Sequence, residues 1–237
     1  MIDNLEIVKE KVDFPIDSEL KKLGVSKIIS FVAKGWRGFV FKVKIGNKIA
    51  ALKIGSPERL LKEANVLKTA NRIRIGPKLY NSTHHCVAMQ FIYGKRYPDF
   101  IETASKTQTK QTVLKILKQA EKLDKAGIDH GELSRADKHI IVRVSGAPGH
   151  RGTERRSGST VSRCPRIYFI DFEKGSTVRK PHNFGSVLNY LLLNPHSFVA
   201  RKTREKLNIQ LKEVKRYARQ SSWRKEGSWT RSWAGIF

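Results

Sequence analysis

Lys53 and Glu63 have the side-chain types and the spacing to form a buried ion pair. Lys53 ends the apolar stretch "AALK", and Glu63 follows ten residues later in a predicted helix. A lysine that points inward from an apolar strand is costly unless it is paired. The helical repeat puts Glu63 on the same face as Leu60 and Leu67, so Glu63 also points inward. We expect a Lys53–Glu63 ion pair that can bind a phosphate group. The alternative is two unrelated side chains whose charged ends reach solvent.

Gly35 and Gly38 lie in the stretch "AKGWRGFV" at 33–40, between two predicted strands. Glycine at such a turn has no side chain to block a phosphate, and it permits the backbone dihedral angles that a close approach requires. A plain hairpin turn explains the same two glycines without any ligand.

Three carboxylates in the second half of the chain could bind a metal ion. Glu132 and Asp137 follow a long predicted helix, and Asp171 ends the predicted strand at 167–171. Hard oxygen ligands suit Mg²⁺, which binds few protein carboxylates together with substrate phosphates. A carboxylate that the metal does not use can orient an attacking hydroxyl or accept its proton. The plain interpretation of Asp171 is a strand that runs into a turn.

The sequence of the first part of the chain predicts an antiparallel sheet with one helix. This sheet and helix would position Lys53 and Glu63. Alternating apolar residues and a tight turn at Gly46 predict strands. Ser56 as N-cap and Pro57 at the first helical position mark the start of the helix that carries Glu63. The five strands are expected at 28–32, 39–45, 49–54, within 78–85, and at 86–92.

The second part is expected to be mostly helical. Apolar residues at helical spacing from 109 onward close on Gly127, a residue type that favours the position just after a helix. Two short strands are predicted at 140–144 and 167–171. Further helices are predicted at 184–193 and 198–219.

The stretch 143–166 between these two strands is rich in Gly, Ser and Arg and has no periodicity, so we expect a flexible insertion. The fold class predicted from the pattern is α+β. The expected divisions are residues 1–93, residues 94–219 with the insertion at 143–166, and a basic tail at 220–237.

The order of these elements resembles the protein-kinase fold, which has two lobes. The glycine-rich loop G-x-G-x-x-G-x-V of that fold is similar to residues 33–40, with alanine in place of the first glycine. The resemblance implies a nucleotide-binding N-lobe at 1–93, with a compact, mostly helical C-lobe at 94–219. It also implies a hinge in "MQFIYG" at 89–94, whose backbone would bond an adenine. The implied nucleotide-binding residues are Gly35, Gly38, Val40, Ala51, Lys53, Glu63, Met89, Gln90 and Phe91.

The catalytic loop H-R-D-x-x-x-x-N of that fold resembles the stretch that holds "HGEL" at 130–133 and Asp137. Its metal-binding D-F-G resembles Asp171 with the two residues that follow. The sequence departs from these motifs at Glu132, which replaces aspartate, at Asp137, which replaces asparagine, and at Glu173, which replaces glycine. The chain has "HG" in place of H-R, and only a short stretch follows Asp171. In both features it resembles the small atypical kinases. These are the RIO kinases, the archaeal predicted serine/threonine kinases and the small kinase subunit of the tRNA threonylcarbamoyl-adenosine machinery.

The resemblance implies an ATP- and Mg²⁺-dependent serine/threonine protein kinase or ATPase. Lys53 would hold the α- and β-phosphates, Asp171 and Asp137 would hold Mg²⁺, and Glu132 would position the acceptor hydroxyl or water. Two alternatives remain. One is a catalytically weak or inactive kinase-like module that binds RNA, and the other is a small-molecule phosphotransferase.

The chain is strongly basic, with a formal charge of +26 from 47 Lys and Arg against 21 Asp and Glu. Such a charge favours polyanionic partners, and we expect a tRNA or a ribosomal precursor. A lysine-rich solvated surface is the alternative. The insertion and the tail are each rich in basic residues, and the tail adds tryptophans that can stack on bases. The expected RNA contacts are Arg155, Arg156, Arg219, Trp223, Arg224, Trp229 and Arg231.

Two cysteines are too few for a four-cysteine zinc site or a disulfide framework. The longest apolar run, "VLNYLLL" at 187–193, is far too short to cross a bilayer. The first residues mix acids and bases and show no apolar signal core. From the sequence we therefore expect a cytoplasmic protein without a membrane partner.

Overall fold

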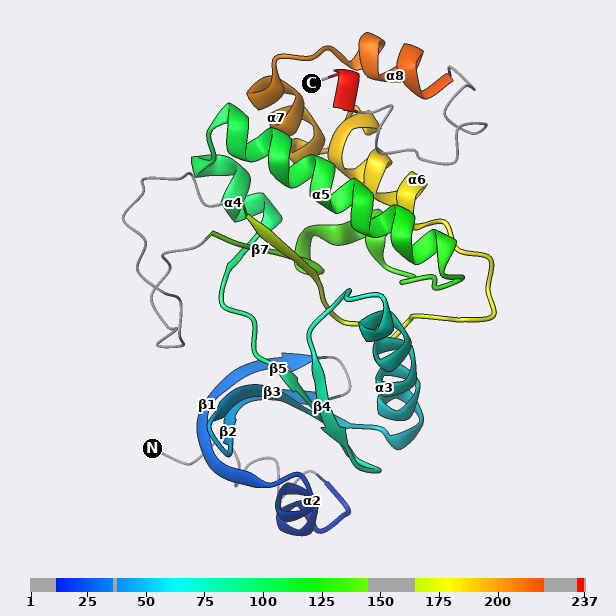
Figure 1. Ribbon diagram of the computed structural model, residues 1–237. Coiled ribbons are helices and arrows are strands. Elements are labelled where there is room, and N and C mark those ends of the chain that lie inside the picture. Colours follow the sequence, from blue (N-terminus) through cyan, green and yellow to red (C-terminus); the bar gives the residue numbers. More distant parts are fainter. Residues whose placement is uncertain (1–11, 36–37, 145–164, 220–233, 237) are drawn as a thin grey trace. The chain divides into compact units, whose positions relative to one another are not determined.

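The computed structural model describes residues 12–35, 38–144, 165–219 and 234–236 (Figure 1). Internal contacts divide the chain into two units. The first unit comprises Met1–Ile92 together with Asp171–Gly175, and the second comprises Tyr93–Ile170 together with Ser176–Phe237. The short segment that begins with Asp171 therefore belongs to the first unit, although the chain on both sides of it belongs to the second.

A five-stranded antiparallel sheet is the frame of the first unit, with the strand order β1-β2-β3-β5-β4 (Figure 1). Gly46 closes the β2–β3 turn at a φ of 52°, a value that glycine adopts without steric cost. The predicted sheet and its helix are confirmed. The elements are α2 (Ile16–Lys22), β1 (Val25–Gly35), β2 (Gly38–Ile45), β3 (Lys48–Gly55), α3 (Pro57–Arg72), β4 (Leu79–Ser82) and β5 (Cys86–Gln90).

The sheet of the first unit is covered by two helices. Helix α3 packs against β3, β4 and β5, and the predicted apolar stripe of Leu60, Ala64 and Leu67 is buried. Ser56 occupies the N-cap of α3 with an extended backbone, but its side chain makes no capping hydrogen bond, contrary to the usual role of serine there. Helix α2 was not predicted; its buried Ile16 and Leu20 join the core that the sheet residues form.

The second unit is mostly helical and carries a small antiparallel sheet in the order β6-β7-β8. Its longest helix, α5, begins with a capping box in which Ser105 and Gln108 each bond the other's backbone N–H. The elements are β6 (Lys95–Arg96), α4 (Tyr97–Thr103), α5 (Lys106–Lys125), η1 (Leu133–Lys138), β7 (Ile140–Arg143), β8 (Arg166–Phe169), α6 (Asn183–Leu188), η2 (Asn189–Leu193), α7 (Phe198–Leu207), α8 (Leu211–Arg219) and η3 (Ala234–Ile236).

The prediction of one helix at 198–219 is wrong, because the chain breaks between α7 and α8. Asn208 sits there at a φ of 59° and a ψ of 46°, in the left-handed region. Asparagine tolerates that region better than most residues, so Asn208 ends α7 as a glycine would. The other long predicted helix does end at the expected place, with Gly127 at a φ of 69° just after α5.

None of the helices in the described part of the chain has the length and apolar character needed to span a membrane. Residues 145–164 and 220–233 lie outside the described residues. The expected RNA contacts Arg155, Arg156, Trp223, Arg224, Trp229 and Arg231 fall in these stretches, whereas Arg219 ends α8 and is exposed.

Candidate functional site

Lys53 lies at the centre of three charged side chains in the first unit. It belongs to β3, where it lies opposite Val40 of β2 and Val87 of β5. Its Nζ donates a hydrogen bond to Oε1 of Glu63 at 2.6 Å and another to Oδ1 of Asp171 at 2.8 Å. The side chain of Glu63 is 1% exposed and that of Asp171 is 34% exposed. The pair expected from the sequence is therefore a triad, with Asp171 as the second carboxylate.

The electrostatics of the triad keep Lys53 charged. Burial by itself would lower the pKa of Lys53, but the charges of Glu63 and Asp171 outweigh it and raise that pKa above its ordinary value. Burial raises the pKa of Glu63, Lys53 opposes the rise, and the charge of Asp171 adds to it. Two carboxylates against one ammonium leave the ionised triad with a net negative charge, which favours a further cation at its exposed end.

The segment that carries Asp171 is fixed to the first unit at several points. Asp171 has a φ of 69°, a left-handed conformation that costs free energy in residues other than glycine. Phe172 is fully buried and its carbonyl accepts a hydrogen bond from the Gly175 N–H at 2.9 Å. Glu173 accepts a hydrogen bond at 2.5 Å from Nη1 of Arg59, which lies one turn before Glu63 on α3. The two ion pairs made by Asp171 and Glu173 hold the segment against β3 and α3.

A cavity of about 140 Å³ opens beside the triad, within the first unit. Pockets that enclose drug-sized ligands are typically about 300–1,000 Å³, so this one suits a phosphate-sized group. Its lining comprises Gly35, Gly38, Phe39, Val40, Lys53, Ile54, Gly55, Ser56, Arg59, Leu60, Glu63, Asp171 and Glu173. The predicted residues Gly35, Gly38 and Val40 are thus brought to the same cavity as Lys53, Glu63 and Asp171.

Gly38 also has a structural reason to be glycine. A Cβ at this position would lie 2.4 Å from the carbonyl oxygen of Ile54 on β3, a separation that real Cβ atoms essentially never show. A Cβ on Gly35 would lie 3.6 Å from the Gly38 carbonyl oxygen, an ordinary contact. The close approach of β2 to β3 therefore requires Gly38, while Gly35 is free to serve a ligand.

The donor set at the cavity fits a magnesium ion. Mg²⁺ keeps several waters and binds through one or two carboxylates plus phosphate oxygens, rather than through a full cage of protein ligands. Asp171 is such a carboxylate, partly exposed, at the lining of a cavity that also holds a lysine ammonium.

Comparisons with known proteins bear on the fold of the chain. No family model matches the chain. An uncharacterised protein of Methanocaldococcus jannaschii is 28% identical over 127 residues, which are 54% of this chain and 90% of that protein. A crystal structure of the Rio2 kinase of Chaetomium thermophilum, in an ADP/Mg²⁺-phosphoaspartate complex, aligns with 92% of this chain and 73% of its own at a TM-score of 0.58 and 13% identity. The chain has a RIO-like atypical kinase fold. The predicted fold class and the predicted resemblance are confirmed.

The residues expected to form the hinge of this kinase-like fold are used within the sheet. Met89 is buried on β5 opposite Ala51. The backbone N–H of Gln90 donates to the carbonyl of Lys78 at 2.8 Å, and that of Phe91 donates to Ile49 at 3.3 Å. An adenine that bonded either of these two amides would have to displace a bond of the sheet.

The residues expected to form the catalytic loop belong to the second unit. Oε2 of Glu132 lies 3.9 Å from Nε2 of His139, and Asp137 accepts a hydrogen bond from the Tyr190 hydroxyl at 3.2 Å. Burial, followed by the charge of Asp137, raises the pKa of Tyr190, so this hydroxyl keeps its proton and remains a donor. His130 is buried, with its Nε2 3.1 Å from the carbonyl oxygen of Ile170, which agrees with a structural role.

Sequence reasoning missed Arg59 and the role of Glu173. The signal was present on α3, because Arg59 lies four residues before Glu63 and so shares its face of the helix. What the sequence does not give is the pairing of Arg59 with a residue 114 positions away. Glu173, which departs from the glycine of D-F-G, makes a specific contact in this fold.

Proposed function

We propose that this protein is an ATP- and Mg²⁺-dependent phosphotransferase or ATPase of the atypical RIO-like type. The observation that carries the proposal is the Lys53–Glu63–Asp171 triad beside a small cavity lined by Gly35 and Gly38. A lysine held charged between two carboxylates is suited to bind phosphate oxygens, and a partly exposed aspartate next to it is suited to bind a metal ion.

Each residue of the triad has a separate task in this proposal. Lys53 binds the α- and β-phosphates through an ammonium that its raised pKa keeps protonated at neutral pH. Glu63 is buried and orients that ammonium. Asp171 supplies the oxygen ligand for Mg²⁺, and Arg59 with Glu173 keeps the Asp171 segment in place. Bound Mg²⁺ would neutralise charge on the transferred phosphoryl group.

Glu132 and Asp137 keep the roles that the resemblance implies. Glu132 would position the acceptor hydroxyl or water, and Asp137 would assist Asp171 at the metal. A second candidate function is nucleotide binding with little or no turnover. It is favoured because the Tyr190 hydroxyl already donates a hydrogen bond to Asp137, so this carboxylate has less capacity left to bind the metal. An acceptor in an RNA-containing complex, such as a tRNA or a ribosomal precursor, is proposed from the charge of +26.

A thermal-shift titration with ATP, with and without Mg²⁺, tests the nucleotide and metal assignments. Saturation at 100 times the dissociation constant stabilises a folded protein by about 2.7 kcal/mol, which raises the melting temperature by several degrees. We expect wild type to show a larger shift with Mg²⁺ than without it. Asp171→Asn should lose this Mg²⁺-dependent part and keep its fold, because asparagine tolerates the positive φ of position 171.

Two results would overturn the assignments. Absence of any shift with ATP in wild type would remove nucleotide binding. An equal Mg²⁺-dependent shift in Asp171→Asn would remove Asp171 as the metal ligand.

A further inference from the structure

A second concave surface of the first unit lies between α3 and β4 and shares no residue with the cavity at Lys53. We call it the α3–β4 groove. It has a volume of about 660 Å³. Figure 1 shows β4 running alongside α3. Its lining comprises Ala64, Asn65, Lys68, Asn71, Arg74, Gly76, Lys78, Leu79, Tyr80, Asn81, Ser82 and Gln90. Among the residues that the structure describes, the lining holds three cationic side chains and no carboxylate.

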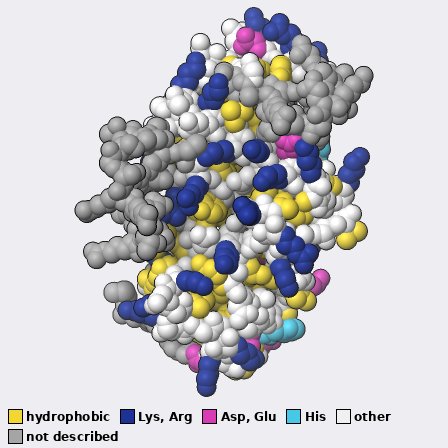
Figure 2. All heavy atoms as spheres, in the orientation of Figure 1, with side chains coloured by type: hydrophobic (Ala, Val, Ile, Leu, Met, Phe, Trp, Pro, Cys, Tyr) yellow, Lys and Arg dark blue, Asp and Glu magenta, His cyan; other side chains and the backbone are white. Residues whose placement is uncertain are grey.

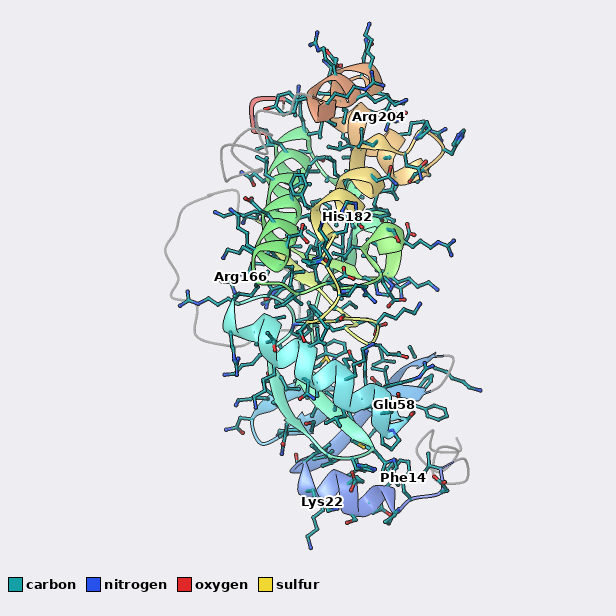
Figure 3. All side chains as sticks on the ribbon, turned by 90° about the vertical axis from the view of Figure 1, so that its right-hand side faces the viewer. Phe14, Lys22, Glu58, Arg166, His182 and Arg204 are labelled. Carbon is teal, nitrogen blue, oxygen red and sulfur yellow. The ribbon has the colours of Figure 1, made fainter. Side chains whose placement is uncertain are left out.

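The three cations of the groove are exposed and uncompensated. Lys68, Arg74 and Lys78 make no ion pair with a carboxylate in the described part of the chain. The acidic residues of α3 lie elsewhere, since Glu58 is at the start of the helix, as Figure 3 shows, and Glu63 is buried against Lys53. The groove is therefore a region of positive potential that no neighbouring acid in its lining reduces.

Hydrogen bonds fix the backbone of the loop that carries Arg74 and Lys78. Asn71 donates through Nδ2 to the carbonyls of Ile75 at 3.0 Å and Pro77 at 2.9 Å, and its Oδ1 accepts from the Leu79 N–H at 2.8 Å. Lys78 is fixed further, because its carbonyl accepts from the Gln90 N–H at 2.8 Å. A backbone that is already ordered loses less conformational entropy on binding.

The chemistry of the lining matches single-stranded nucleic acid. Cations that follow a groove neutralise successive phosphates, while amide side chains can bond the edges of bases. The groove supplies Asn65, Asn81 and Gln90 beside its three cations. Tyr80 also lines the groove, but its ring packs on the core of the unit and lies under the Lys48 ammonium, 5.2 Å from it, so we assign it no base contact. An acidic peptide would use the cations, whereas a nucleotide strand would use the cations through its phosphates and the amides through its base edges. Lys and Arg side chains are also widespread on the face in Figure 2, which gives any polyanion a general attraction.

We propose that the α3–β4 groove is a docking surface for single-stranded RNA. This surface lies outside the triad and does not depend on the proposed phosphotransferase activity.

The test is fluorescence anisotropy with a labelled 12-nucleotide single-stranded RNA of mixed sequence, titrated with the full chain at several salt concentrations. The groove variant is Lys68→Glu, Arg74→Glu and Lys78→Glu. The matched control is Lys21→Glu, Lys27→Glu and Lys44→Glu, which changes the net charge equally at exposed residues of the same unit. A competition arm uses poly-glutamate as an acidic polypeptide. Circular dichroism and the midpoint of urea denaturation verify that each variant is folded.

We expect the dissociation constant for RNA to be at least about tenfold higher for the groove variant than for wild type. The slope of log K against log salt should be smaller in magnitude by about 2, because each of the three lost phosphate contacts contributes about 0.7 on a single strand. The control should change both much less, and poly-glutamate should compete poorly. Equal effects of the two triple variants would overturn the proposal, because binding would then follow net charge alone. Undetectable RNA binding by wild type, or strong competition by poly-glutamate, would overturn it as well.

Discussion

Replacing Lys53 with methionine would leave a buried carboxylate without its cation. Glu63 is 1% exposed and lies 2.6 Å from the Lys53 ammonium, and methionine keeps much of the volume of the lysine stem. Removal of one partner of a buried ion pair costs about 3–5 kcal/mol. Lys53 is itself 19% exposed, which favours the lower end of that range. We expect the free energy of unfolding of Lys53→Met to be about 3 kcal/mol below that of wild type at pH 8.

This loss should depend on pH in a defined direction. Burial raises the pKa of Glu63 from an ordinary value of 4.5, and without Lys53 nothing in the triad opposes the rise. The folded state then binds the Glu63 proton more tightly than the unfolded state does. The contribution of this proton to stability is fully present below pH 4.5 and is lost as the pH rises through the raised pKa. Lys53→Met should therefore lose less stability at pH 5 than at pH 8.

Urea denaturation followed by far-UV circular dichroism measures the effect at pH 5, 6.5 and 8. The set comprises wild type, Lys53→Met, Glu63→Gln and the double variant. Because glutamine is neutral, the double variant should be more stable than Lys53→Met at pH 8. A double variant no more stable than Lys53→Met, or a loss in Lys53→Met that is the same at pH 5 and pH 8, would refute the assignment of a buried charge to Glu63.

Three further predictions concern other parts of the first unit. The Thr83 hydroxyl lowers the pKa of Glu19 to about 2; burial opposes this effect and Lys22 adds to it. Wild type should therefore lose stability as the pH falls from 4.5 towards 2. Glu19→Gln should lose less unfolding free energy than wild type over this pH range, because glutamine does not titrate. The same pH dependence of unfolding in the two proteins would contradict the prediction. Burial and the charge of Glu19 raise the pKa of the Cys86 thiol to about 12. In a Cys164→Ser variant, a thiol reagent should therefore label Cys86 only as fast as the protein unfolds. Rapid labelling of the folded protein would contradict this prediction. Arg59→Glu and Glu173→Arg should each destabilise the protein, and the double swap should recover about 0.2–1 kcal/mol, the usual coupling of an exposed ion pair. Additive effects in urea denaturation would show that the pair is not coupled.

Much of the fold follows from local patterns in the sequence. The alternating apolar residues of β2 and β3, the turn at Gly46, and the stripe on α3 each have one arrangement that buries their apolar side chains. The Lys53–Glu63 contact follows from the same logic, because both residues point inward from adjacent elements. The short α2 escaped prediction because its stability comes from packing Ile16 and Leu20 on the sheet, and not from a long periodic pattern.

The parts that the sequence could not provide are long-range pairings. The contacts of Arg59 with Glu173 and of Tyr190 with Asp137 join residues 114 and 53 positions apart, and no local period encodes them. Sequence motifs assigned Gln90 and Phe91 to an adenine-binding hinge, whereas hydrogen bonding within the sheet uses their N–H groups. The α3–β4 groove likewise depends on how β4 returns alongside α3.

The most direct test of the proposed function is a measurement of γ-phosphate transfer from labelled ATP in the presence of Mg²⁺, summed over transfer to water and to protein. Wild type should transfer phosphate, and Asp171→Asn should reduce the rate to background while its circular dichroism spectrum and its urea midpoint show an intact fold. Equal rates for wild type and Asp171→Asn, or no transfer by wild type, would contradict the proposal that the Lys53–Glu63–Asp171 triad supports Mg-ATP chemistry.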